Sequence, residues 1–103
     1  MDKELALELI EKMNDDAFWR TCPNYSLQQW FLKGFDPGHF MGHLLSNNLL
    51  KAVQYADMGN RRIISDIMWW VFNNLPEACY GSRTRFENWK GLYKYAFPEP
   101  EEV

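Results

Sequence analysis

Two histidines four residues apart, His39 and His43, are the residues of this chain best spaced to bind a transition metal. On a helix they would share one face. A zinc site needs a third or fourth ligand, which Asp36 or Asp57 could supply. The segment between the histidines lacks the glutamate of helical metalloproteases. A metal-dependent hydrolase built on this pair is therefore only the third of our functional hypotheses, and we expect no bound metal and no cofactor.

The sequence lacks the patterns of nucleophilic catalysis. Gly81-Ser82 does not form a nucleophile elbow, because no strand is predicted before it. Cys22 and Cys79 have no identifiable base, and two cysteines do not make a disulfide framework. There is also no phosphate-binding glycine loop and no paired-carboxylate signature. We therefore predict no catalytic residues and a protein that is not an enzyme.

Three predicted helix starts could bind an anion through free backbone N–H groups and the positive end of the helix dipole. They are Pro37-Gly38-His39 with the adjacent Phe40, Asn60-Arg61-Arg62, and Ser82-Arg83. Arginine binds phosphate bidentately, so Arg61, Arg62, Arg83 and Arg85 indicate a small anionic nucleotide as one candidate ligand. The structural alternative is that Gly38 eases packing and that the arginines are solvated.

Short polar residues beside aromatic ones could contact the polar edge of a ligand. Asn47 and Asn48 lie inside a predicted helix, where asparagine has poor propensity. The pair therefore indicates a buried network, a contact or a break in the helix. Asp57 and Asn60 bracket a predicted turn between helices, and their structural interpretation is capping and turn formation. Their functional interpretation is hydrogen bonding to a ligand.

Tryptophans suggest a surface that binds protein. Trp69 and Trp70 are adjacent, so on a helix their side chains point roughly 100° apart and cannot enter one core from the same face. We predict that at least one of them is exposed in the monomer and covered in a complex or a self-assembly. Trp89 is a further candidate contact. The chain has seven Phe, five Trp and five Tyr, more than one small core usually buries, and aromatic residues are enriched in interfaces.

The spacing of apolar residues predicts an all-α fold, a compact single-domain bundle of about four to five helices. Polar caps and glycines set their boundaries. The predicted helices are Asp2–Met13, a short helix from a Ser26 capping box to Gly34, Asp36 to about Asp57, Arg61–Leu75 after an Asn60 cap, and Ser82 to about Lys90. A short turn capped by 14–16 would carry Phe18 and Trp19. Residues 1–95 form the predicted domain, and 96–103 an acidic, frayed tail.

The predicted core follows from three- and four-residue steps along the two longest helices. The first contributes Phe40, Leu44, Leu45, Leu49, Ala52, Val53 and Ala56, and the second Ile63, Ile64, Ile67, Met68, Val71 and Phe72.

Charge and length exclude some classes of protein. The 103 residues are enough for one domain, and the net charge of −3 argues against general binding to a nucleic-acid backbone. No apolar run approaches a membrane span, and the acidic N-terminus does not read as a signal peptide. We expect a cytoplasmic protein with reduced thiols.

The motifs of residues 35–89 resemble a family of small proteins found in phages and prophages. The residues that carry the resemblance are Pro37-Gly38-His39-Phe40, Asn47-Asn48-Leu49, Ala56-Asp57-x-x-Asn60, Pro76, Gly81-Ser82 and Trp89. Family members often have an acid where this chain has Asn48, so no role of that acid is carried over. The resemblance implies a phage accessory gene, by analogy one that counters host defence in the host cytoplasm.

Three functional hypotheses result. The leading one is a non-enzymatic phage accessory protein that binds and occludes a protein partner. The alternative is a sponge for a small nucleotide messenger, and the second alternative is the His39–His43 hydrolase. The sequence leaves self-association into a homo-oligomer open.

Overall fold

The computed structural model describes residues 3–13 and 22–97. Within these residues the chain forms eight α-helices, one 3-10 helix and no strand. They are α1 (Lys3–Met13), α3 (Tyr25–Lys33), α4 (Gly38–Leu45), α5 (Leu49–Tyr55), α6 (Met58–Arg62), α7 (Ile64–Asn74), η1 (Glu77–Cys79), α8 (Arg83–Asn88) and α9 (Leu92–Ala96). The all-α class is confirmed. The expected four to five helices were too few, and the predicted Asp2 cap and the turn carrying Phe18 and Trp19 lie outside the described residues.

The helix expected from Asp36 to Asp57 is two helices, α4 and α5, separated by the asparagine pair. Asn47 has a positive φ of 63°, a left-handed conformation that asparagine tolerates better than most residues. Asn48 is the N-cap of α5, and its side-chain oxygen accepts a hydrogen bond from the Lys51 N–H at 3.2 Å. Of the three explanations offered by the sequence, the structure shows the break.

The helix expected from Arg61 to Leu75 also has a different start. Asp57 is the N-cap of α6, and its carboxylate accepts from the Asn60 N–H at 2.7 Å. Asn60 is therefore not an N-cap but a residue inside α6. Arg61 and Arg62 lie in the last turn of this five-residue helix rather than at its positive end. The helix start expected at Asn60-Arg61-Arg62, on which the anion site depended, is therefore not formed by these residues.

Some of the remaining helix ends lie where the sequence predicts them, and others do not. Gly34 ends α3 with a φ of 77°, and Ser82 caps α8 by accepting from the Arg85 N–H, both as predicted. The N-cap of α3 is Asn24 rather than Ser26, since the Asn24 side chain accepts from Leu27 N–H at 3.0 Å. Asp36 accepts from Gly38 N–H at 2.9 Å, but the N-cap position of α4 is Pro37, one residue later than expected.

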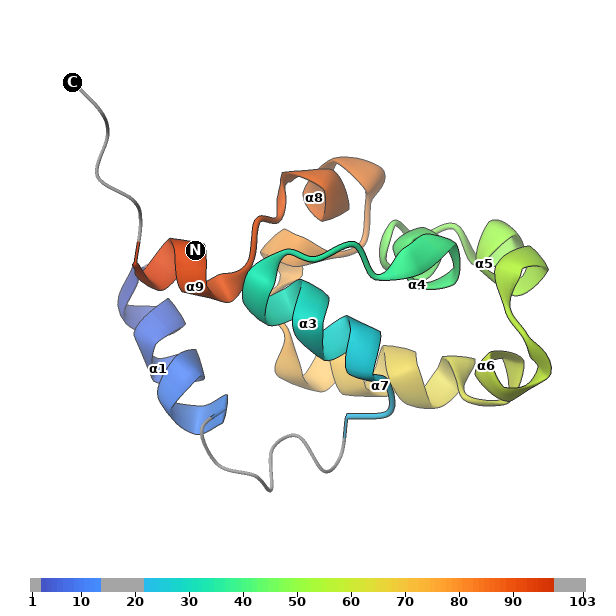
Figure 1. Ribbon diagram of the computed structural model, residues 1–103, viewed down its shortest axis with the longest axis horizontal. Helices are drawn as coiled ribbons and strands as arrows, with labels where there is room; N and C mark the ends of the chain where they lie inside the picture. Colours follow the sequence, from blue (N-terminus) through green and yellow to red (C-terminus); the bar gives the residue numbers. More distant parts are fainter. Residues whose placement is uncertain (1–2, 14–21, 98–103) are drawn as a thin grey trace.

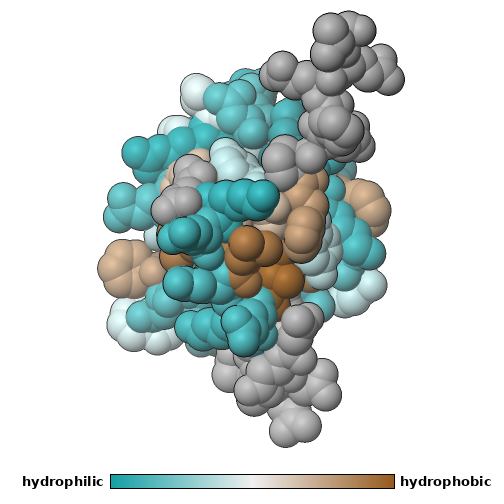
Figure 2. All heavy atoms as spheres, turned by 90° about the vertical axis from the view of Figure 1, so that its left-hand side faces the viewer, coloured by the Kyte–Doolittle hydropathy of each residue, from teal (hydrophilic) through white to brown (hydrophobic). Residues whose placement is uncertain are grey.

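The helices lie around the central α3 (Figure 1). α4 packs against both α5 and α8, and α9 packs against both α1 and α3. Sequence reasoning missed α9 and ended α8 at Lys90 instead of Asn88. Ala96, the first residue of the expected tail, is the last residue of α9 and is fully buried. Hydrophobic residues gather near the centre of the face on which α1 and α9 lie, and hydrophilic residues lie to their left in this view (Figure 2).

Aromatic rings form the centre of the core. Trp89 stacks on Phe31 with 5.3 Å between ring centroids and 2° between planes, and its Nε1–H donates to the Phe31 carbonyl at 3.1 Å. α7 buries Ile67, Trp70 and Val71. Three residues expected in the core are exposed instead: Phe72 at 66%, Leu49 at 57% and Val53 at 38%. Trp70 takes the core position on α7, so the apolar stripe of this helix is rotated from the one predicted.

Two glycine turns meet backbone to backbone beside this stack. Gly34 ends α3 and Gly91 precedes α9, both with positive φ. A methyl group on Gly34 would lie 2.5 Å from the Lys90 carbonyl oxygen, and one on Gly91 would lie 2.6 Å from the Lys33 carbonyl carbon. Only glycine permits both the conformation and the approach. This contact fixes α9 against the end of α3.

Gly91→Ala should destabilise the protein strongly, by more than about 3 kcal/mol, because left-handed strain and a backbone clash act together. Gly38→Ala is the matched control. Its φ is 87°, but nothing lies within 4 Å of the added methyl group, so only strain of roughly 1–2 kcal/mol remains. Urea unfolding of both variants and of the wild type measures the two losses in the free energy of unfolding. Equal losses would show that the contact between the two turns contributes nothing.

Candidate functional site

A polar groove with a volume of about 290 Å³ runs along α4, which lies between α5 and α8 (Figure 1). α4 forms the floor, α8 one side and the start of α5 the other. The lining residues are Asp36, Gly38, His39, Gly42, His43, Ser46, Asn48, Lys51, Arg83, Phe86 and Glu87. We refer to them together as the α4 groove.

Two contacts set the shape of the α4 groove. The Gly81 N–H donates to the Leu45 carbonyl at 2.8 Å, which brings the start of α8 to the end of α4. On the floor, Gly42 lies beside the ring of Phe86: a methyl group on Gly42 would be 3.4 Å from this ring, an ordinary van der Waals contact. Phe86 in turn stacks on Trp30 with 5.5 Å between centroids, which ties the groove to the core.

The charged residues of the α4 groove come from α5, from α8 and from the segment that precedes α4. Arg83 follows the contact between Gly81 and Leu45, and Lys51 lies in the first turn of α5, so both flank the C-terminal end of α4. Asp36 hydrogen-bonds the first residue of α4, at the other end. Glu87 is one helical turn beyond Arg83 and shares a second, smaller hollow with Asp36 and Lys90. Arg83 Nε lies 2.7 Å from a Glu87 carboxylate oxygen, so acidic and basic groups are in contact along the groove.

His39 and His43 do share one face of α4, as their spacing predicts. Both rings stack on Tyr55 of α5, with centroids 5.1 and 5.3 Å away. Across residues 3–13 and 22–97, no three His, Cys, Asp or Glu side chains form a group that could hold a metal ion. In this arrangement the two histidines join α4 to α5 along the groove wall.

A second surface lies on α7 and is aromatic. Trp69 is 70% exposed and Phe72 is 66% exposed, and their ring centroids are 6.4 Å apart. Trp70 is only 5% exposed, so the two adjacent indoles diverge as predicted. A shallow hollow beside Trp69 includes Asp66 and Asn73. We call Trp69 and Phe72 the α7 aromatic pair.

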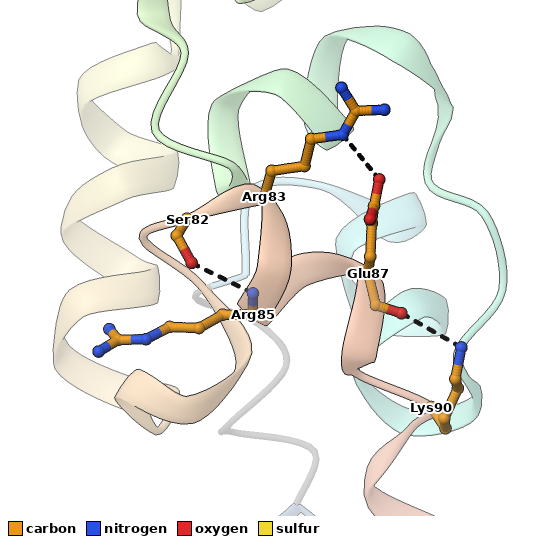
Figure 3. Close-up of polar contacts among 5 residues, drawn as sticks. All are labelled: Ser82, Arg83, Arg85, Glu87 and Lys90. Carbon is orange, nitrogen blue, oxygen red and sulfur yellow. Dashed lines mark hydrogen bonds and ion pairs between the residues drawn. The ribbon is translucent and has the colours of Figure 1, made fainter.

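The arginines expected to bind phosphate do not converge. Arg83 Nε lies 2.7 Å from a Glu87 carboxylate oxygen in an exposed ion pair, and this hydrogen bond raises the pKa of Arg83 above its usual value (Figure 3). The Arg85 side chain extends away from Arg83 and donates weakly to the carbonyls of Glu77 and Tyr80, at 3.4 and 3.5 Å. Arg61 and Arg62 are on α6, outside the groove.

The structure separates the residues predicted from the sequence into several groups. His39, Asn48 and Arg83 line the α4 groove, and Trp69 belongs to the α7 aromatic pair. The rest are caps or turn residues (Asn47, Asp57, Ser82), residues of α6 (Asn60, Arg61, Arg62) or buried residues (Phe40, Trp70, Trp89). Sequence reasoning missed Lys51, Phe86 and Glu87 in the groove and Phe72 on α7. The Arg83–Glu87 spacing of four residues was the available signal for one of them.

Neither cysteine is placed as a nucleophile. Cys79 is fully buried, and burial raises the pKa of its thiol to about 12. Burial also raises the pKa of the half-buried Cys22 thiol. A thiol with a raised pKa holds little of the reactive thiolate at neutral pH. Neither residue lines the α4 groove.

Comparison with known proteins adds no assignment: no protein-family model, curated protein or solved structure matches the chain. Within the described residues, no helix is long and apolar enough to cross a membrane. The arguments that follow rest on the geometry of the groove and of the α7 aromatic pair.

The buried thiol of Cys79 predicts a specific loss of stability in alkali. Its pKa is higher in the folded state, so its contribution is complete below the unfolded pKa of about 9 and is lost as the pH rises toward 12. In urea unfolding, the wild type should lose up to about 1.4 kcal/mol more per pH unit above pH 9 than Cys79→Ala does. Cys22→Ala is the comparison: its thiol is less buried, so this variant should remove less of the alkaline loss than Cys79→Ala does. Parallel curves for wild type and Cys79→Ala would contradict the assignment.

Asn48→Ala should lower the free energy of unfolding by about 1 kcal/mol, because the N-cap of α5 is lost. Asn48→Asp should retain most of the stability, since its carboxylate can accept the same hydrogen bond. Thermal melts of both variants test this. If Asn48→Ala melts like the wild type, the residue is not a cap, and its position in the groove becomes the reason for its presence.

Proposed function

We propose that this chain is a non-enzymatic accessory protein that binds a protein partner through the α7 aromatic pair and occludes it. The observation that carries the proposal is the exposure of Trp69 and Phe72 on the outer side of a helix whose inner side is well packed. Large aromatic side chains gathered on a surface are typical of interaction sites. Tryptophan is also enriched among the residues that dominate binding energy.

The α7 aromatic pair has no evident part in holding the fold together. The core side of α7 is formed by Ile67, Trp70 and Val71, which are all buried. The Trp69 indole instead contacts Phe72, its neighbour one turn away. Asp66 and Asn73 supply polar groups at the edge of the pair, in the manner of the polar rim around an interface core. Binding therefore explains their residue types better than folding does.

The alternatives receive less support. A nucleotide sponge needs aromatic faces and arginines in one concave site, and in the α4 groove only Phe86 and Arg83 meet. A hydrolase needs a third metal ligand beside His39 and His43, and the described residues offer none in reach. A role in countering host defence rests on the resemblance to phage proteins alone. It enters the proposal as the setting in which a host protein would be the partner.

Site-specific photo-crosslinking tests the proposal. A benzophenone side chain at position 69 should capture one protein from extracts of the cells in which this chain is produced. The matched control carries the benzophenone at Phe35, which is 57% exposed but lies outside α7. Excess unlabelled wild type should compete with the capture, and excess Trp69→Ser should not. Identical products at both positions would contradict the proposal.

Replacing the two indoles separately gives a second test. Trp70→Ser should destabilise the protein by about 3–5 kcal/mol, as expected for the loss of a buried indole. Trp69→Ser should leave the melting temperature nearly unchanged and weaken association by at least about tenfold. Thermal melts and sedimentation with the crosslinked partner provide the measurements. If Trp69→Ser destabilises the fold as much as Trp70→Ser, the α7 aromatic pair is structural.

A further inference from the structure

The shallow hollow beside Trp69 lies along one face of α7. It has a volume of about 550 Å³ and is bounded on its other side by Pro23, which precedes α3 (Figure 1). The α7 residues that line it follow one another at steps of one, three and four, so they cover one continuous face of the helix: Asp66, Trp69, Trp70, Asn73 and Asn74. We refer to this surface as the α7 hollow.

The two asparagines of the α7 hollow have their amide nitrogens committed to the helix. Asn73 Nδ2 donates to the Trp69 carbonyl at 2.7 Å, and Asn74 Nδ2 donates to the Trp70 carbonyl at 2.8 Å. A main-chain carbonyl only accepts hydrogen bonds, so the side-chain atom beside it must be the nitrogen. The amide oxygens are therefore the polar atoms that these two residues can offer to a ligand, and an amide oxygen is an acceptor.

Asp66 supplies the charge of the α7 hollow. Its carboxylate is exposed, and it forms no hydrogen bond or ion pair with another residue in 3–13 or 22–97. Within the same part of the chain, no Lys or Arg lines the hollow. An acid in the first turn of α7 also suits the helix dipole. The dipole does not account for the indole one turn further on, which is 70% exposed.

We propose that the α7 hollow binds an arginine side chain of the protein partner. The guanidinium lies with its face on the Trp69 indole and its N–H groups toward the Asp66 carboxylate and the asparagine oxygens. This inference rests on the proposed function, which makes the ligand part of a protein. Phe72 does not line the hollow, so the partner can cover the α7 aromatic pair while its arginine occupies the hollow beside it.

Charge and hydrogen-bonding complementarity favour arginine over other side chains. A guanidinium has N–H donors and no acceptor, which complements a carboxylate and two amide oxygens. It is planar and weakly hydrated, so it stacks on an indole while its edge forms hydrogen bonds. A lysine ammonium is compact and strongly hydrated and cannot combine both contacts in one plane. An acidic side chain would be repelled by Asp66.

Three small probes test the arginine assignment on the full chain: the Nα-acetyl amides of arginine, citrulline and lysine. Citrulline has nearly the shape of arginine but no charge. In two-dimensional NMR titrations, we expect the arginine probe to shift the Trp69 indole N–H and the Asn73 side-chain amide. It should bind roughly tenfold more tightly than the citrulline probe, and more tightly than the lysine probe. Equal affinity for arginine and either other probe, or no shift at millimolar concentration, would overturn the proposal.

Variants locate the binding. Asp66→Asn and Trp69→Leu should each lower the affinity for the arginine probe severalfold, followed by the Asn73 side-chain amide. Both residues are exposed, and thermal melts verify that both variants remain folded. Glu8→Gln and Phe35→Leu are matched controls at exposed positions outside the hollow, and they should bind as the wild type does. Equal losses in the controls would show that the probe does not bind at the α7 hollow.

The arginine assignment and the protein-binding proposal fail on different results. If the benzophenone at position 69 captures a partner but the arginine probe does not bind the wild type, only the arginine assignment is wrong. If the arginine probe binds and depends on Asp66 while no partner is captured, the α7 hollow is supported as a guanidinium site, and its place in a protein interface is contradicted.

Discussion

The fold depends on the packing of the segment Trp89–Ala96 against α3. Trp89 stacks flat on Phe31 and donates its indole hydrogen to the Phe31 carbonyl, a buried bond that joins residues 58 positions apart. An unsatisfied buried indole N–H would cost about 1–3 kcal/mol, so this bond fixes the position of the ring as well as its burial. Two residues later, Gly91 meets the end of α3 backbone to backbone. α9 then packs against α1, so the placement of the N-terminal helix depends on the same contacts.

The same packed rings also position the floor of the α4 groove. Trp30, beside Phe31 on α3, stacks on Phe86 of α8, and Phe86 lies against Gly42 of α4. A chain of ring contacts thus runs from the buried centre of the protein to the floor of the groove. The charged residues of the groove lie outside this series of rings and are largely exposed. The floor is therefore set by the core, while the charges contribute little to its stability.

Local signals in the sequence were sufficient where a single residue decides the backbone conformation. Gly34 and Ser82 ended and began helices as predicted, because a left-handed C-cap and a serine N-cap each act within a few residues. The asparagine pair was noticed but its outcome was left open, since the break depends on whether α5 can fold back on α4. The apolar stripe of α7 was misplaced because Trp70 and Phe72 are both large and apolar. Only the position of neighbouring helices decides which of them is buried.

The candidate sites were harder to predict because they combine short helices that are far apart in the sequence. His39, Asn48 and Arg83 were selected for separate reasons, and nothing in their spacing indicated that α8 would fold back alongside α4. Lys51 and Glu87 looked like ordinary surface charges, which is how they would behave on isolated helices. Their common position arises from the Gly81–Leu45 hydrogen bond and from the position of Phe86 beside Gly42. The gathering of these charged residues in one groove is thus a property of the tertiary fold.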